Sequence, residues 1–223
     1  MGLITGYILL IIIVLLCMKF ISKRIGSKAF DRFVMRIHKP LAYIAIIVGI
    51  LHGVVTLQVF KTRPVIMYIV GIMIIVLGGA ACVTHRYRKT LGRKWILFHR
   101  IAAIAIVALL VCHMVVYFID FGNYQKAISD ISVMDIDVST VADGTYIGSC
   151  DVGYIYAKVK VTVEAGKITD IKLLEHNNER GKKAEKITDT IKEKQSITVD
   201  AVSGATNSSK VIQKAIYDAL TNN

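Results

Sequence analysis

Asp200-Ala-Val-Ser-Gly-Ala-Thr-Asn-Ser-Ser209 is a short stretch of small and hydroxylic residues, and an amphipathic run follows it directly. In that run, residues 210–220, apolar side chains recur at positions 211, 212, 215, 216, 219 and 220, a spacing that predicts a helix. The stretch therefore lies where a helix begins. Hydroxyl groups at such a place can cap free backbone N–H groups, and the positive end of the helix dipole favours a phosphate. Local chemistry alone leaves both an ordinary helix cap and a phosphate site open.

The order Asp-x-x-Ser-Gly-Ala-Thr, from Asp200 to Thr206, resembles the flavinylation motif of the FMN-binding domain family. That family includes the flavin subunits of the sodium-pumping NADH:quinone reductase and of the Rnf complex. The resemblance extends back through Val161-Thr-Val-Glu-Ala-Gly-Lys-Ile-Thr-Asp-Ile171 to Asp143-Gly-Thr-Tyr-Ile-Gly148, and it covers about 80 residues. It implies that the Thr206 hydroxyl carries FMN through a phosphoester bond, which a dedicated flavin transferase makes.

The resemblance also implies roles for the neighbours of Thr206. Asp200 and Ser203 match the motif and are expected to be recognised by the transferase. Gly204 and Ala205 are expected to keep the approach to the threonine open. The flavin phosphate would meet the backbone N–H groups that follow the threonine, those of Asn207, Ser208 and Ser209.

Apolar residues make up 54% of the 223-residue chain, but they are unevenly distributed. Four apolar runs long enough to cross a bilayer lie at 3–21, 41–60, 65–83 and 101–119. Of the 28 Lys and Arg residues, 15 lie in residues 1–119, where Asp31 is the only acidic residue; the other 13 accompany 15 acidic residues in 120–223. The net charge of +12 therefore belongs to the membrane half, and we interpret it as membrane topology, not as a nucleic-acid surface.

The basic residues are concentrated in two of the connections between the runs. Thirteen of them lie between runs one and two or between runs three and four, against only Lys61 and Arg63 between runs two and three. Because positively charged loops stay in the cytoplasm, we expect the N-terminus and the C-terminal half to lie outside the cell membrane. Runs two and four then cross the lipid in the same direction. The four cysteines form no Cys-x-x-Cys pair, which argues against zinc ribbons and c-type haem attachment.

We therefore expect a membrane-embedded, all-α four-helix bundle in residues 1–119 and a linker in 120–141, with a short strand at 131–138. A small α+β, extracytoplasmic FMN-binding domain is expected in 142–223. Its predicted strands are 144–150, 154–164 and 167–174, with a hairpin turn at Ala165-Gly166 and helices over 182–194 and after Thr206. His176 is expected at the surface, and Gln195 is a further candidate for a flavin contact.

Five of the six histidines lie in or beside the apolar runs: His38, His52, His85, His99 and His113. His38 and His52 are 14 residues apart in run two, and His99 and His113 are 14 residues apart in run four. In a helix, 14 residues rise about 21 Å and return to within about 40° of the same face. On parallel helices, His38 can face His99 near the cytoplasm, and His52 can face His113 in the outer half of the membrane.

Each facing pair could supply the two axial ligands of one haem iron. The arrangement resembles the di-haem b-type cores of the ferric-reductase-like and cytochrome b families, which implies two haem b groups. Pro40 favours a helix start or a kink beside His38, and His85 is an alternative inner ligand. Histidines in a membrane can also bridge helices, or lie near the interface, without binding a metal.

These features together predict a redox subunit that carries electrons across the membrane. The electrons would come from a cytoplasmic donor or from quinol, pass two haems, and reach covalent FMN and then an external acceptor or reductase. No Gly-x-Gly-x-x-Gly fingerprint is present, so oxidation of a nicotinamide cofactor would belong to a partner. The alternatives are a membrane-anchored flavoprotein whose histidines serve quinone or structure, and a redox sensor without sustained flux.

Overall fold

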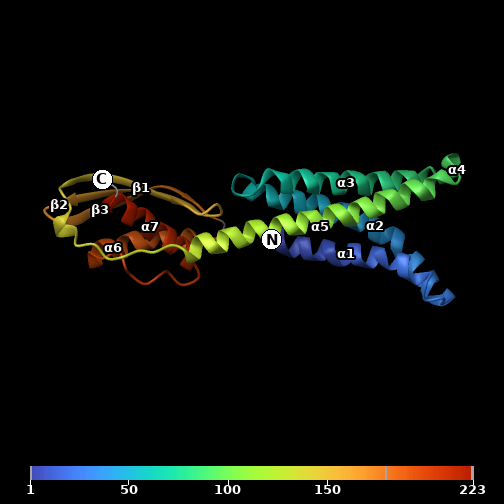
Figure 1. Cartoon of the computed structure of the whole chain (residues 1–223), viewed down its shortest axis with the longest axis horizontal. Helices are drawn as coiled ribbons and strands as arrows, with labels where there is room; N and C mark the ends of the chain where they lie inside the picture. The colour runs from blue at the N-terminus through green and yellow to red at the C-terminus, as the bar shows by residue number, and fades with distance from the viewer. Residues whose placement is uncertain (1, 179, 222–223) are drawn as a thin grey trace. The chain divides into compact units, whose positions relative to one another are not determined.

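The computed structural model describes residues 2–178 and 180–221, which fall into two compact units, Met1–Phe118 and Ile119–Asn223. The first unit is helical, and the second holds a small sheet with helices (Figure 1). Helix α5 spans Lys94–Ser129, so its last residues, 119–129, belong to the second unit. The predicted fold class, an apolar helical region followed by a small α+β domain, is confirmed.

Four long apolar helices form the first unit: α1 (Gly2–Ser22), α2 (Lys28–Thr56), α3 (Val65–Arg86) and the greater part of α5. The 3-10 helix η1 (Leu57–Thr62) extends α2, and the short helix α4 (Arg88–Leu91) precedes α5. By length and composition, all four long helices can cross a membrane. Their apolar side chains are widely exposed, as at Ile47 (67%) and Val76 (62%). In water such exposure costs about 25 cal/mol per Å², whereas lipid accommodates it, so this unit is a membrane domain.

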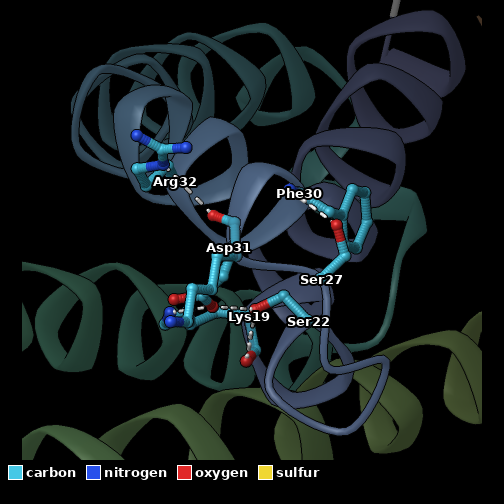
Figure 2. Close-up of polar contacts among 7 residues, drawn as sticks. Lys19, Ser22, Ser27, Phe30, Asp31 and Arg32 are labelled. Atoms are coloured by element: carbon cyan, nitrogen blue, oxygen red, sulfur yellow. Dashed lines mark hydrogen bonds and ion pairs between the residues drawn. The ribbon is translucent and has the colours of Figure 1, made fainter.

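The turn between α1 and α2 is stabilised by the only acidic residue of residues 1–119 (Figure 2). Asp31 accepts hydrogen bonds from the Lys19 ammonium at 2.5 Å and from the Ser22 hydroxyl at 2.6 Å. Ser27 caps α2, because its hydroxyl accepts from the backbone N–H of Phe30 at 3.3 Å. These contacts fasten the end of α1 to the start of α2.

Two helices are longer than the apolar runs predict. α2 begins at Lys28, after the Ser27 cap, and Pro40 lies inside it, so the interpretation of Pro40 as a helix start is wrong. A proline inside a helix removes one hydrogen bond, the one to the carbonyl of Arg36, and the helix tolerates this loss. α5 continues to Ser129, beyond the end of the fourth apolar run and into the predicted linker.

The sheet of the second unit is antiparallel with the strand order β1-β2-β3. Its strands are β1 (Gly144–Asp151), β2 (Tyr156–Glu164) and β3 (Lys167–Asn177), close to the three predicted ranges. Burial alternates along β2, so that Val159, Val161 and Val163 are fully buried. The β2–β3 turn is Ala165-Gly166 with φ values of 51° and 71°, as a two-residue hairpin requires. The predicted hairpin is confirmed.

Helices cover the buried face of this sheet. The 3-10 helix η3 (Lys182–Lys186) leads into α6 (Ile187–Lys194), which packs on β3, and α7 (Thr206–Thr221) packs across β1 and β2. Gly148 of β1 permits the close approach of α7. A Cβ atom at residue 148 would lie 2.2 Å from the carbonyl oxygen of Ala215, a distance that no side chain could occupy without displacing the helix.

Residues 131–137 have no regular secondary structure, and the 3-10 helix η2 (Val138–Thr140) follows them, so the strand predicted at 131–138 is wrong. The alternation of apolar residues has another cause. Val138 is buried, and Ile131, Val133 and Ile136 pack against the core of the second unit. Ile128 of α5 is buried in the same core. One-sided packing on a neighbouring surface therefore imitates the period of a strand.

Candidate flavin and haem sites

Thr206 is the first residue of α7 and is exposed. The residue before it, Ala205, is buried, and its carbonyl accepts from the N–H of Ser209 at 2.9 Å, which closes the first helical turn. The backbone N–H groups of Thr206, Asn207 and Ser208 have no acceptor among the residues that the structure describes. These are the donors that a helix start leaves open, and they are suited to bind an anion beside an accessible hydroxyl.

Gly204 gives the motif its turn. Its φ is +75°, and the Ala205 N–H donates to the Val202 carbonyl at 2.9 Å across this turn. A Cβ at position 204 would meet nothing within 4 Å, so the glycine is required by backbone conformation and not by space. Asp200 and Ser203 are both exposed, so a modifying enzyme could reach them together with Thr206.

Ser209 does not have the predicted role. Its N–H is bonded to the Ala205 carbonyl, and its hydroxyl, fully buried, donates to the same carbonyl at 3.1 Å. That hydroxyl also accepts from the N–H of Val202 at 3.0 Å. The donors of Ser209 are already used inside the protein, so Ser209 holds the motif turn against α7. Of the predicted N–H set, only those of Asn207 and the buried Ser208 have no acceptor among the described residues.

The segment that leads into the motif is held by polar contacts, of which those made by Gln213 are buried. The Gln213 amide on α7 donates to the carbonyls of Ile197 and Val199 at 2.9 and 2.8 Å. Asp135 accepts from the Ile197 N–H at 3.0 Å and from the Ser196 hydroxyl at 2.8 Å. Burial opposes ionisation of Asp135, but these hydrogen bonds outweigh it and lower the pKa of its carboxyl below the ordinary value.

The Gln195 side chain is hydrogen-bonded to the start of β3. Its side-chain oxygen accepts from the Ile168 N–H at 2.8 Å, and its amide donates to the Ile168 carbonyl at 2.9 Å. The residue ends α6 in a left-handed conformation with φ of 51°. Gln195 therefore ties the end of α6 to the start of β3, and a flavin contact of this residue stays a prediction.

A group of aromatic residues beside α7 was not predicted from the sequence. The Asn207 amide donates to the Tyr124 hydroxyl at 2.8 Å, although the two residues are 83 positions apart. The rings of Tyr124 and Tyr154 are stacked, with centroids 4.4 Å apart and planes inclined by 15°. The Tyr154 hydroxyl donates to Asp120 at 2.6 Å, and Phe121 lies against both tyrosines, with centroids at 6.2 and 6.4 Å. No local sequence pattern brings these residues together.

His176 is not a surface residue, so that expectation is wrong. Its side chain is only 3% exposed, because it shares a face of β3 with the buried side of the sheet, opposite Ala157. The Nδ1 atom lies 3.0 Å from a Glu185 carboxylate oxygen and 3.2 Å from the Asn178 amide. The Nε2 atom is buried without a hydrogen-bond partner among the described residues.

The structure brings His38 of α2 and His99 of α5 together. Their ring centroids are 6.1 Å apart and their planes are inclined by 64°. Both Nδ1 atoms are buried and have no hydrogen-bond partner in the described part of the chain. Two imidazoles on opposite sides of one metal ion, each with a bond of about 2 Å, also hold their centroids about 6 Å apart. The same separation suits an edge-to-face ring contact, so the distance is necessary for a shared iron but not sufficient.

His85 of α3 contacts Trp95, with centroids 5.7 Å apart, and Trp95 in turn lies 6.1 Å from His99. The His38 ring therefore lies next to the His99 ring, whereas the Trp95 indole contacts both His85 and His99. Among the described residues, no three His, Cys, Asp or Glu side chains gather to hold a metal ion. A haem iron needs only two axial ligands from the protein, because the porphyrin supplies the others.

His52 and His113 are not brought into ring contact. The His52 Nδ1 lies 2.9 Å from the Thr5 hydroxyl of α1, and its ring lies against Gly6, where a Cβ would be 3.4 Å away. The His113 ring lies beside Gly71 of α3, and its Nδ1 is buried without a partner among the described residues. Each outer imidazole thus packs against a glycine on a neighbouring helix.

Residues 153–221 match the family model of the FMN-binding domain. No curated protein and no solved structure matches the chain. The match begins in the β1–β2 connection and includes β2, β3, the Thr206 motif and all of α7. An FMN-binding domain points to electron transfer by a flavin. The C-terminal unit of this chain, with its sheet and helices, therefore matches the FMN-binding domain. In the sequence it follows four helices long and apolar enough to span a membrane.

Proposed function

We propose that Thr206 carries FMN covalently through its hydroxyl. The observation that carries this proposal is an exposed threonine on the first turn of α7, within a segment that matches the FMN-binding domain. The open N–H groups of Asn207 and Ser208 would bind the phosphate oxygens, and the left-handed turn at Gly204 presents the threonine. Bound FMN would supply a carrier that accepts one or two electrons.

The modification can be tested on the full chain co-expressed with a flavin transferase. In the transfer, a diphosphate P–O bond of a flavin dinucleotide donor would break, a nucleoside monophosphate would leave with the threonine proton, and an Oγ–P bond would form. The peptide that contains Thr206 should therefore gain the mass of FMN less one water. Thr206→Val, which keeps the shape but lacks the hydroxyl, should abolish this gain. Thr198→Val changes another exposed threonine of the same segment and should leave it intact. An unmodified Thr206 peptide in the wild-type chain would overturn the proposal.

We further propose that the membrane domain binds two b-type haems, the inner one between His38 and His99 and the outer one between His52 and His113. The inner pair is supported by the 6.1 Å ring separation and by two buried nitrogen atoms without partners. The outer pair is supported by its equal spacing along the same two helices and by the glycines that make room for both rings. Bound haems would provide one-electron carriers at two depths of the membrane.

A pyridine haemochrome assay tests the haem proposal. The full chain should contain two b haems, and His99→Ala should contain one. If His38→Ala leaves the haem content unchanged while His85→Ala reduces it, the inner ligand is His85. A wild-type chain without haem would favour a membrane-anchored flavoprotein whose histidines serve quinone or structure.

The resulting function is electron transfer across the cell membrane, from a cytoplasmic donor or quinol to the flavin and then to an external acceptor or reductase. Support for the membrane orientation that this function needs comes from the thirteen basic residues in the two connections expected in the cytoplasm. Protease protection in oriented vesicles tests it, because the FMN domain should be cleaved only from the extracytoplasmic side.

A further inference from the structure

Phe121, Tyr124 and Tyr154 form an aromatic cluster in the second unit. Tyr154 is its buried member, 5% exposed, and its hydroxyl is fixed by Asp120. Tyr124 is half-buried and stacks on Tyr154, and Phe121 is 37% exposed. The cluster thus has an inner end anchored in the core and an outer end that solvent can reach.

The position of the cluster relates it to the flavin site. Asn207, which follows Thr206 in the first turn of α7, donates to the Tyr124 hydroxyl at 2.8 Å. The aromatic rings therefore lie beside the helix turn whose open N–H groups suit a phosphate. A phosphoester fixes only the phosphate end of FMN. The ribityl chain is flexible, so the position of the isoalloxazine ring depends on the protein surface that it contacts. That ring is flat and largely apolar, and it gains stability by stacking on aromatic side chains.

We propose that the Phe121–Tyr124 side of this cluster is the platform on which the isoalloxazine ring of the Thr206-linked FMN rests. This proposal rests on the proposed flavinylation of Thr206. Tyr124 has two roles in it: the ring provides the stacking surface, and the hydroxyl holds Asn207 so that the first turn of α7 faces the cluster. Tyr154, fixed by Asp120, holds the Tyr124 ring from behind.

The platform also assigns a role to residues 119–129 of α5. They precede the segment that matches the FMN-binding domain, yet they contribute Phe121 and Tyr124 to the cluster and Ile128 to the core. The flavin site would then consist of the domain and the last turns of α5 together, all within the second unit.

Flavin fluorescence in the full-length, flavinylated chain tests this proposal, because electron-rich phenol rings quench a flavin that stacks on them. The fluorescence per bound FMN should be low in the wild type and should rise several-fold in Tyr124→Leu and in Phe121→Leu, with loss of the visible circular dichroism of the flavin. Tyr124→Phe keeps the ring but loses the phenol, so it should fluoresce more than the wild type while keeping the visible circular dichroism of a stacked flavin. Tyr146→Leu is the matched control: this half-buried tyrosine donates to the Ala142 carbonyl at 2.6 Å, and its loss should leave the flavin signals unchanged.

The outcomes separate the two proposals. Mass spectrometry of the Thr206 peptide first establishes whether FMN is attached, and its absence from the wild type would overturn both. If FMN is attached but Tyr124→Leu and Phe121→Leu fluoresce as the wild type does, the platform is wrong while flavinylation stands. Loss of the visible circular dichroism in Tyr124→Phe as well as in Tyr124→Leu would also overturn it, because the ring would then not matter. Phe121→Leu, at an exposed position, keeps the test valid if Tyr124→Leu fails to fold.

Discussion

Gly204 has a backbone conformation that other residues rarely adopt, and the motif turn depends on it. Replacement by alanine places a Cβ at φ of +75°, which should lower the free energy of unfolding by about 1 kcal/mol. The measurement is denaturant unfolding of the detergent-solubilised chain, followed at the second unit. Gly122→Ala is a matched control, since Gly122 lies in helix α5 with nothing within 4 Å of an added Cβ. Gly122→Ala should raise the free energy of unfolding slightly. Equal changes of the free energy of unfolding in the two variants would contradict the requirement for glycine at position 204.

Cys150 of β1 should be an unreactive thiol. Burial, reinforced by the Asp218 carboxylate and opposed by Lys214, raises its pKa from 9.0 to about 11. Only the thiolate reacts, so at pH 8 the reactive fraction is about a hundredfold smaller than for an ordinary thiol. Alkylation by iodoacetamide, measured on the Cys150 peptide, should keep accelerating as the pH rises past 9. In guanidinium the same peptide should follow an ordinary thiol curve, and a folded-state plateau near pH 9 would contradict the prediction.

Among single residues, positions set by local features are predictable from the sequence, and positions set by tertiary contacts are not. The position of Thr206 at the start of a helix could be predicted, because the apolar spacing and the motif are local features. Ser209 could not be assigned correctly, because its backbone N–H already donates to the Ala205 carbonyl in the first turn of α7. His176 was misplaced because its burial depends on Glu185 and on the register of β3, which a strand pattern does not specify.

Among the secondary-structure elements, the contact of β1 with α7 is the most sensitive to substitution. A Cβ at Gly148 would lie 2.2 Å from the Ala215 carbonyl oxygen and 2.5 Å from the Ala219 nitrogen, both backbone atoms. Gly148→Ala should therefore destabilise the second unit by about 2 kcal/mol or more. Gly153→Ala, at a loop glycine where an added Cβ has open space, should cost less, although its φ of 82° is also left-handed. Thermal unfolding compares the two, and the reverse order would contradict the packing described.

Helix α1 supports the outer histidine of α2. The Thr5 hydroxyl lies 2.9 Å from His52 Nδ1, a contact that orients an imidazole and increases its basicity as a ligand. If His52 binds haem, Thr5→Val should raise the midpoint potential of the outer haem, because a less basic ligand favours the reduced iron. Thr84→Val is the control, since the Thr84 hydroxyl donates to the Ala81 carbonyl within α3. Spectroelectrochemistry measures both, and an unchanged potential in Thr5→Val would show that this contact does not tune a haem.

Most elements follow from periodicity and turn chemistry, and the exceptions have a physical cause. Apolar runs predict the membrane-embedded part of a helix, but α2 starts at the Ser27 cap and α5 ends at Ser129, outside the runs. Residues 131–137 alternate because one side packs on a core assembled from distant segments. The aromatic cluster joins Tyr124 to Asn207 across 83 positions and has no local signature.

The whole molecule consists of a basic, lipid-exposed helical domain and a nearly neutral domain that matches an FMN-binding family. This division is visible in composition alone, because charge and hydropathy change together near residue 119. The proposed function needs both parts: histidine pairs that hold haem in the lipid, and a threonine that holds FMN beyond it. Neither part alone would carry electrons across a membrane to a fixed flavin.

The most direct test of this account is the optical spectrum of the purified full-length protein, oxidised and reduced, after co-expression with a flavin transferase. If Thr206 carries FMN and both histidine pairs bind haem, the spectrum should show one FMN and two b-type haems per chain, with flavin and haem reducible in the same molecule. A spectrum with flavin but no haem, or with haem but no flavin, would contradict it.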